Sequence, residues 1–228
     1  MASGWAVAEV TPGLECSVGP APEGAVAEGA VAKGVQPLAR SFYRRDPLQV
    51  APELLNKLLV AGDRVGRIVE VEAYGGPDDS ASHSWRGRTR RNATMFGPAG
   101  LAYVYFTYGM HWCANATCGE EGEGLAVLLR ALSPVTGIEA MRVVRPAARR
   151  DRDLCSGPAK LCQAMGLGRD HDGADLVSPD RDLAIVTDGM APPERPGVGV
   201  RIGIGTGPAA LYPWRWWVTG DPNVSRPG

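Results

Sequence analysis

Apolar and charged side chains alternate most regularly along residues 67–74, which read Arg-Ile-Val-Glu-Val-Glu-Ala-Tyr. A period of two predicts a β-strand, because successive side chains of a strand point to opposite faces. One face of this strand would carry Ile68, Glu70, Glu72 and Tyr74. A charge without a partner is very costly to bury, so we expect this face to meet solvent or a binding cleft.

Three segments have the features of helices. Residues 51–59 combine a proline in the first turn with a stripe of leucines, which predicts a helix. A second helix is predicted over residues 134–144. The third spans residues 158–165, with Ser156 as a candidate N-cap and Gly166 as the C-terminal stop.

The remaining apolar runs predict further strands. Residues 101–107 and 112–117 flank Tyr108-Gly109, where glycine permits a tight turn, so this pair predicts a β-hairpin. The other strands are predicted over residues 125–132, 198–204 and 214–218. Strands with few intervening helices favour an α+β fold. We expect a single domain with a mostly antiparallel, curved sheet, flanking helices and a protruding hairpin.

Domain organisation follows from where sequence complexity changes. Residues 1–36 include a near-repeat of Glu-Gly-Ala-Val-Ala, and such small residues bury too little apolar area to offset the cost of ordering. We therefore predict a disordered tail over residues 1–36 and one folded domain over residues 37–228. Residues 75–100 are predicted to be a long loop, and loops of this length inside a domain are usually functional.

Charge and cysteine usage narrow the function classes. The net charge is −1, yet arginines cluster within residues 86–91 and 142–152, where they would either contact phosphate or form a solvated surface. The five cysteines are odd in number and include no Cys-x-x-Cys pair, which favours reduced thiols without a metal site. No apolar run is long enough to span a bilayer and no secretory signal is evident, so we expect an intracellular location.

Candidate chemistry centres on Glu72. A carboxylate near several tyrosines suits a pocket that grips a planar ligand and activates a water beside it. Arg130 interrupts an otherwise apolar strand, and a buried arginine needs an anionic partner, for which Glu72 is one candidate.

Seven ordered blocks extend this pattern. They are Glu72-Ala73-Tyr74, His83-Ser84, Arg91-Asn92 with Met95-Phe96, Tyr103-Val104-Tyr105 with Tyr108-Gly109-Met110, Asn115, Leu-Leu-Arg-Ala-Leu at 128–132 and Leu-Cys-Ser-Gly-Pro-Ala-Lys-Leu-Cys-Gln-Ala at 154–164. In order and spacing they resemble the alkyladenine DNA glycosylases, the mammalian-type 3-methyladenine DNA glycosylase family. The resemblance covers the chain from about residue 37 to about residue 225.

The resemblance implies a monofunctional repair enzyme that flips alkylated or deaminated purines out of double-stranded DNA and hydrolyses the N-glycosidic bond. It implies that Glu72 activates the water, that Arg130 helps to hold it, and that no metal or other cofactor takes part. The family's base-binding residues correspond to Tyr74, His83, Tyr105 and Asn115. Its DNA-binding positions correspond to Tyr108 at the hairpin tip and to Met110, His111, Arg91 and Lys160. A monomer in the bacterial cytoplasm or nucleoid is the expected form.

Two other functions fit parts of the sequence. Glu70 and Glu72 would lie about 6.6 Å apart on one strand, near the separation that inverting carbohydrate glycosidases use. Their approach from a single side argues against that function. A non-catalytic reader of damaged DNA would keep the rings and basic loops without needing a pocket carboxylate. Lesion preference is left open, as is the effect of His111, where relatives often carry an aromatic residue.

Overall fold

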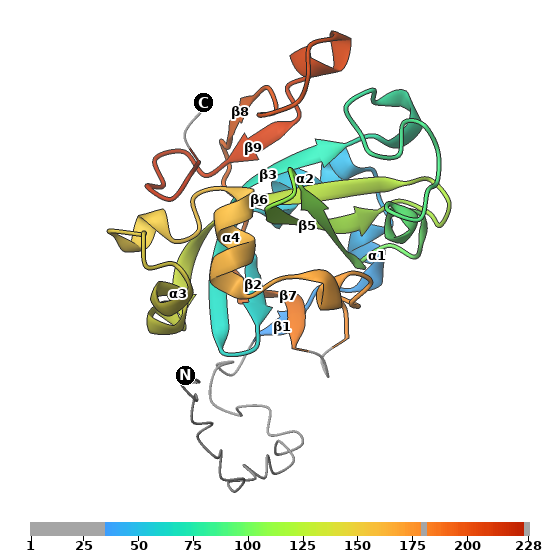
Figure 1. Ribbon diagram of the computed structural model, residues 1–228. Helices are drawn as coiled ribbons and strands as arrows, with labels where there is room; N and C mark the ends of the chain where they lie inside the picture. Colours follow the sequence, from blue (N-terminus) through green and yellow to red (C-terminus); the bar gives the residue numbers. More distant parts are fainter. Residues whose placement is uncertain (1–34, 179–181, 226–228) are drawn as a thin grey trace, which may run out of the picture.

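The computed structural model describes residues 35–178 and 182–225, and one curled antiparallel sheet organises them (Figure 1). The main path of the sheet runs β1-β7-β2-β3-β6-β5-β4, and β9 pairs with both β3 and β8. The strands are β1 (Gln36–Pro37), β2 (Leu58–Ala61), β3 (Arg64–Tyr74), β4 (Ala102–Thr107), β5 (His111–Cys118), β6 (Leu125–Thr136), β7 (Leu183–Thr187), β8 (Gly197–Gly199) and β9 (Arg215–Trp217). The predicted α+β class with an antiparallel, curved sheet is confirmed.

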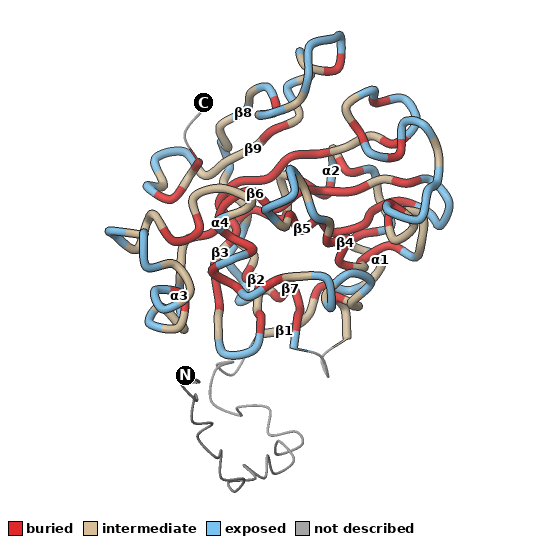
Figure 2. The backbone as a smooth tube through the Cα atoms, in the orientation of Figure 1, coloured by how far each residue is buried: buried red, intermediate tan, exposed pale blue. Residues whose placement is uncertain are grey.

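Short helices flank the sheet. The α-helices are α1 (Arg40–Tyr43), α2 (Pro47–Leu54), α3 (Ile138–Val144) and α4 (Pro158–Met165). Single turns of 3-10 helix occur at Gly76–Asp78, Ala93–Phe96, Asp151–Asp153, Arg169–His171 and Pro208–Leu211. The long strands β3 and β6 are buried along most of their length, as the red tube in Figure 2 shows. The core between helices and sheet therefore fixes the two strands that carry the candidate catalytic residues.

The helix predicted over residues 51–59 starts and ends earlier than expected. Asp46 caps α2, because its side chain accepts a hydrogen bond of 2.7 Å from the Leu48 N–H. The helix stops before Leu55, and Asn56 takes a positive φ of 68° that turns the chain. The next leucines, Leu58 and Leu59, belong to β2 instead. Their apolar spacing fits a strand as well as a helix, and pairing with β3 and β7 decides the outcome.

Other element boundaries also differ from the prediction. The segment 134–136 continues β6, and α3 begins only after Gly137, whose φ is 71°. Helix α4 is confirmed with its left-handed Gly166 stop, but its N-cap is Gly157 without a side-chain bond, so the Ser156 prediction is wrong. Of the strand predicted over 198–204, only the first part is strand, as β8. Strands β1, β2 and β7 were missed.

A bulge changes which side chains of β3 share a face. The pairing of β3 with β6 shifts register between Ile68 and Glu70 and again between Glu70 and Val71. Consequently Ile68 and Val71 both pack into the main core, which strict alternation forbids. Glu70 and Glu72 instead both contact Arg130. The predicted single face that included Ile68 is therefore wrong at that residue.

The hairpin and the long loop are found where the sequence predicted them. β4 and β5 pair from Ala102↔Ala116 to Thr107↔His111 and form the protruding hairpin. Residues 75–100 contain two single turns of 3-10 helix and no strand. The predicted tail falls mostly on residues 1–34, which lie outside the described part of the chain. Among the described residues no helix is long and apolar enough to cross a membrane.

Candidate active site

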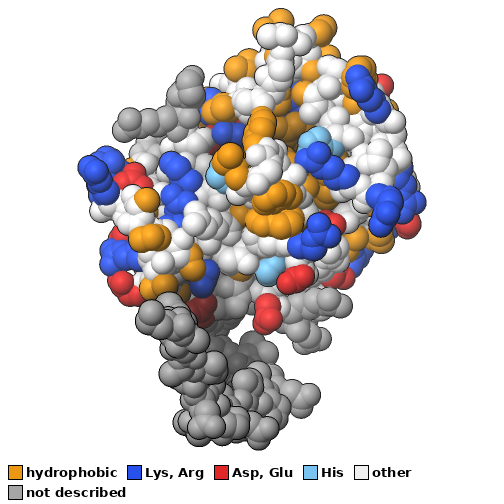
Figure 3. Space-filling model, in the orientation of Figure 1, with side chains coloured by type: hydrophobic (Ala, Val, Ile, Leu, Met, Phe, Trp, Pro, Cys, Tyr) orange, Lys and Arg blue, Asp and Glu red, His pale blue; other side chains and the backbone are white. Residues whose placement is uncertain are grey.

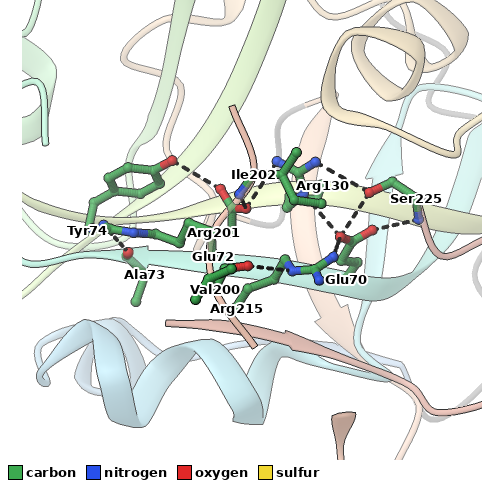
Figure 4. Close-up of polar contacts among 10 residues, drawn as sticks. All are labelled: Glu70, Glu72, Ala73, Tyr74, Arg130, Val200, Arg201, Ile202, Arg215 and Ser225. Atoms are coloured by element: carbon green, nitrogen blue, oxygen red, sulfur yellow. Dashed lines mark hydrogen bonds and ion pairs between the residues drawn. The ribbon is translucent and has the colours of Figure 1, made fainter. Parts of the chain in front are cut away.

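Strands β3 and β6 bring the two predicted catalytic residues together in a buried cluster (Figure 4). The Arg130 Nη1 atom lies 3.1 Å from Oε1 of Glu72, and its Nε atom lies 3.1 Å from Oε1 of Glu70. Both carboxylates have no exposed surface, and Arg130 is buried as well. The predicted pairing of Arg130 with Glu72 is therefore present, and Glu70 joins it as a second partner.

Burial of Glu70 and Glu72 contradicts the expectation that their face meets solvent or a cleft. The expectation assumed that the charges would lack partners, but Arg130 and Arg215 supply two cations. Glu70 also accepts hydrogen bonds from the Ser225 backbone N–H at 2.7 Å and hydroxyl at 2.8 Å. We call Glu70, Glu72, Arg130, Arg215 and Ser225 the carboxylate–arginine cluster.

Glu72 is held at both of its oxygens. Oε1 forms an ion pair with Arg130 and accepts a hydrogen bond of 2.7 Å from the Ile202 N–H, while Oε2 accepts from the Tyr74 hydroxyl at 3.0 Å. Burial raises the pKa of the Glu72 carboxyl, and the Arg130 charge, the Ile202 N–H and the Tyr74 hydroxyl oppose that rise. The group is thus a carboxylate poised to accept a proton more readily than a solvated glutamate.

A cavity of about 510 Å³ adjoins the cluster, and we call it the site cavity. Its walls include four of the predicted base-binding residues together with Arg130: Tyr74, His83, Tyr105 and Asn115. Glu72 itself is not in the wall but lies directly behind it, because its three partners Tyr74, Arg130 and Ile202 all line the cavity. The structure therefore gathers residues from β3, β4, β5, β6 and two loops around one space.

Aromatic rings pack against one another along one wall of the site cavity. The ring centroids of His83 and Tyr105 lie 4.4 Å apart, and those of Tyr103 and Tyr105 lie 5.2 Å apart in a stacked arrangement. His83 Nδ1 lies 3.1 Å from the Tyr103 hydroxyl oxygen. Burial and the nearby Arg91 charge lower the pKa of His83, so its ring stays neutral near pH 7 and can stack on a flat ligand. Asn115, which is 5% exposed, donates to the Tyr103 carbonyl at 3.0 Å.

The hairpin tip projects an aromatic side chain past the mouth of the cavity. Tyr108 is 80% exposed yet also contributes to the cavity lining. Tyr108 and Gly109 have φ values of 51° and 67°, and the Met110 N–H donates to the Thr107 carbonyl at 3.2 Å. Two central residues with positive φ are the pattern of a type I′ turn. Met110 and His111 are exposed beside it.

Figure 3 shows one face of the molecule, with hydrophobic side chains near its centre and basic side chains around them. Arg91 donates from Nη2 to the Phe106 carbonyl at 2.9 Å, and its guanidinium lies 5.6 Å from the Tyr105 ring. Lys160 lies elsewhere, on the wall of a second cavity of about 500 Å³ that also includes Arg150 and Arg152. Arg91 therefore lies beside Tyr105, a wall residue of the site cavity, without lining the cavity itself. Lys160 lines only the second cavity, and Arg130 lines both.

Arg201 is a site residue that the sequence analysis missed. It is 3% exposed, forms two hydrogen bonds of 2.5 and 2.8 Å with Asp79, and donates to the Ala73 and Ala209 carbonyls. Its guanidinium lies over the rings of Tyr74 at 4.7 Å and Trp214 at 5.1 Å. Because Ile202 follows directly, this anchoring fixes the N–H that contacts Glu72. The sequence signal that could have identified Arg201 is a single arginine that follows a run of alternating glycines and valines.

No ligand set for a metal is evident in the residues that the structure describes, since no group of three His, Cys, Asp or Glu side chains gathers there. The groups assembled at the site are instead a buried carboxylate with a raised pKa, a guanidinium and several flat rings. This set can grip a planar group and take a proton from a water, which are the two operations needed to release a base by hydrolysis.

Comparison with known proteins identifies the class. Residues 41–222 match the family described as methylpurine-DNA glycosylase (MPG). A protein of Burkholderia lata is 58% identical over 191 residues, which cover 83% of this chain and 91% of that protein. Relatives from Streptomyces avermitilis and Agrobacterium fabrum are each 46% identical, cover 83% and 82% of this chain, and are each covered over 91% of their own length. All three are provisionally named 3-methyladenine DNA glycosylases.

The protein is therefore a DNA glycosylase, a repair hydrolase that acts on N-glycosyl bonds and has DNA as its substrate. The chain belongs to the methylpurine-DNA glycosylase family, which confirms the resemblance seen in the sequence. This membership decides against both a carbohydrate glycosidase and a non-catalytic reader of damaged DNA.

Proposed function

We propose that the protein removes alkylated or deaminated purines from double-stranded DNA by flipping the damaged nucleotide into the site cavity. The candidate substrates are 3-methyladenine, 7-methylguanine, hypoxanthine and ethenoadenine. Unpairing and unstacking a base costs a few kcal/mol, and least for a damaged base. Stacking on the rings of Tyr74, His83 and Tyr105 returns roughly 1–3 kcal/mol per contact. A purine alkylated at N3 or N7 is cationic, which strengthens this stacking and improves the leaving group.

Within this proposal Glu72 is the general base. A carboxylate has about four lone-pair sites, and Oε2 has Tyr74 as its one partner among the described residues, which leaves capacity for a water. The ionised carboxylate both stabilises the oxocarbenium-like transition state and accepts the proton of the attacking water. Arg130 holds Oε1 and helps to position that water. The single observation that carries the proposal is that the two hydrogen-bond donors to Glu72, Tyr74 and Ile202, and its ion-pair partner Arg130 all line the site cavity.

The remaining residues act on the DNA. Tyr108 at the hairpin tip enters the gap left by the flipped nucleotide, with Met110 and His111 beside it. Asn115 excludes normal guanine through its amide, and Arg91 and Lys160 contact the DNA. We propose that the enzyme acts as a monomer on DNA inside the cell, without a cofactor. Light scattering of the free protein and of its complex with a short duplex tests the stoichiometry.

A charge-neutral substitution tests the assignment of Glu72. We expect Glu72→Gln to lower the rate of base release by at least 100-fold, the order of a lost general base, while binding of a lesion-containing duplex stays within a few-fold. Released bases are measured by chromatography from alkylated and deaminated duplexes, and binding by fluorescence anisotropy. Glu139→Gln is the matched control, because Glu139 lies on the surface of α3 with 83% of its side chain exposed. Unchanged release by Glu72→Gln would remove Glu72 from this role.

A further inference from the structure

Arg130 contacts Glu72 in a way that a free arginine–carboxylate pair would not favour. An arginine facing one carboxylate usually forms two parallel hydrogen bonds, one to each oxygen. Here that pair of hydrogen bonds is not formed with Glu72: the shortest contact between the two side chains is an ion pair of 3.1 Å from Nη1 to Oε1. The Nε atom donates to Glu70 at 3.1 Å, and Nη2 donates to the Ser225 hydroxyl at 3.3 Å. Each nitrogen of the guanidinium thus has a different partner.

Glu70 can hold Arg130 in this orientation because it is itself fixed. Its Oε1 accepts from Arg130, from Arg215 at 3.0 Å and from the Ser225 hydroxyl, and its Oε2 accepts from the Ser225 N–H. Four donors from three separate segments leave this buried carboxylate little freedom to rotate. Arg215 is held in turn by its Nε bond of 2.9 Å to the Val200 carbonyl. Glu70 and Ser225 therefore form a rigid anchor for Arg130 on the side of its guanidinium that faces away from Glu72.

We propose that Glu70 and Ser225 are positioning residues for base release: they hold Arg130 on one oxygen of Glu72 and so keep the other oxygen available to the attacking water. The proposal rests on the proposed roles of Glu72 and Arg130. It gives the segment after β9 a part in the reaction, although Ser225 lies 155 positions along the chain from Glu70 and does not itself line the site cavity. Without Glu70, Arg130 is free to turn and take both oxygens of Glu72.

Two substitutions remove the anchor in different ways. Glu70→Gln keeps the shape of the side chain but replaces one carboxylate oxygen by an amide N–H₂ group. This donor would face either the Ser225 N–H or the two arginines, none of which can accept a hydrogen bond. Ser225→Ala removes only the hydroxyl that joins Glu70 to Arg130, and Ser225→Thr restores a hydroxyl at that place. Asp188→Asn is the matched control, because Asp188 pairs with Arg67 on the same strand as Glu70 but outside the cluster.

The readout is the single-turnover rate of base release at saturating enzyme, beside duplex affinity and thermal denaturation. Misplacement of a catalytic group by about an ångström costs up to 100-fold in rate. On that scale we expect a loss of roughly 10- to 100-fold for Glu70→Gln and roughly 3- to 10-fold for Ser225→Ala. Affinity should stay within about two-fold, as expected for groups that act on the transition state. Ser225→Thr and Asp188→Asn should retain the parental rate.

The pH profile separates positioning from general loss of structure. The groups that face Glu72 are Glu70 and Tyr74 from β3, Cys113 from β5, Arg130 from β6 and the Ile202 N–H from the loop before β9. Glu70 raises the pKa of Glu72 through its negative charge, so Glu70→Gln should move the acidic limb of the profile to lower pH. Ser225→Ala removes no charge and should lower the rate without moving that limb.

The outcomes are distinguishable from failure of the proposed function. The positioning role alone is overturned if the parent protein releases bases and the folded Glu70→Gln and Ser225→Ala proteins release them at the same rate as the parent. Absence of base release by the parent protein on every lesion overturns the proposed function itself. If Glu70→Gln does not fold, the pair Ser225→Ala and Ser225→Thr decides, since equal rates for these two variants and the parent overturn the proposal.

Discussion

The Tyr74 hydroxyl donates to Oε2 of Glu72 at 3.0 Å, so the ring that lines the site cavity also contacts the carboxylate behind it. This hydrogen bond favours the ionised carboxylate and lowers the pKa of Glu72, in opposition to the effect of burial. One side chain therefore both lines the site cavity and tunes the pKa of the carboxylate that we propose as the general base.

Tyr74→Phe should shift the pH dependence while preserving the wall. Without the hydroxyl the pKa of Glu72 should rise further, and because the proposed mechanism needs ionised Glu72, the acidic limb of base release should move to higher pH. Single-turnover rates between pH 5 and about 9 measure the limb. Tyr103→Phe is the matched control, since the Tyr103 hydroxyl contacts His83 and not Glu72. A limb that stays in place for Tyr74→Phe contradicts the assigned role of the hydroxyl.

The Asp79–Arg201 pair should matter for both stability and rate. Breaking a buried ion pair by removing one partner costs about 3–5 kcal/mol, because the other charge is left uncompensated. Asp79→Ala should therefore lower the free energy of unfolding by about that amount and release the Ile202 N–H from Glu72. Urea denaturation measures the first effect and single-turnover base release the second.

Asp188→Ala supplies the comparison for this pair. Asp188 and Arg67 are 26% and 21% exposed at their side chains, whereas Asp79 and Arg201 are fully buried there. Screening by solvent limits such a pair to about 1 kcal/mol or less, and it lies outside the site. Equal destabilisation by the two substitutions would show that burial does not set the strength of the Asp79–Arg201 interaction.

Tyr108 has a backbone conformation that its side chain does not favour. A positive φ of 51° is uncommon for a bulky residue, and asparagine or glycine adopts it at lower cost. Tyr108→Asn should thus leave stability unchanged or raise it by about 0.5–1 kcal/mol, while it removes the ring that we propose to fill the gap in the DNA.

The expected result for Tyr108→Asn is a protein that is at least as stable but releases bases more slowly from duplex DNA. Release from a single-stranded substrate, which needs no gap filled, should change less. Leu211→Asn is the control, because Leu211 is 76% exposed but does not line the site cavity. Equal rates for Tyr108→Asn and the parent on duplex DNA would argue against insertion of the ring.

Local patterns in the sequence were enough to predict the hairpin, α4 and the strand that bears Glu72. Each depends on neighbours in the chain: Tyr108-Gly109 permits the turn, and Gly166 stops the helix. The exchange of helix for strand at Leu58 and Leu59 could not be predicted in this way, since it depends on pairing with β7, more than 120 residues later. The bulge in β3 likewise depends on how β6 packs beside it.

The candidate site likewise combines residues that local sequence patterns predict with contacts that depend on distant parts of the chain. Glu72, Tyr74 and Arg130 were predicted as site residues from a charged alternation and from one arginine in an apolar run. Glu70 was expected to face solvent or a binding cleft, because its partners Arg215 and Ser225 lie 145 and 155 positions away in the chain. A carboxylate that needs a cation can be recognised in a sequence, but which distant cation it receives is decided by the fold.

Asn115 provides a test of lesion discrimination. It lies in the wall of the site cavity with one amide N–H committed to the Tyr103 carbonyl, so its side chain is fixed rather than free to move aside. The 2-amino group of guanine, a donor, would meet this fixed amide, whereas hypoxanthine lacks that group. Asn115→Ala should therefore raise the release of normal guanine by roughly 10-fold or more, the scale on which one extra group in a pocket is discriminated. Release of hypoxanthine should change less.

Cys113→Ala is the control, because it enlarges the same cavity without removing an amide. It should leave the ratio of hypoxanthine release to guanine release unchanged. Chromatography of bases freed from an undamaged duplex and from a hypoxanthine-containing duplex measures both rates, and guanine release at the parental level in an active Asn115→Ala protein would assign discrimination to other residues.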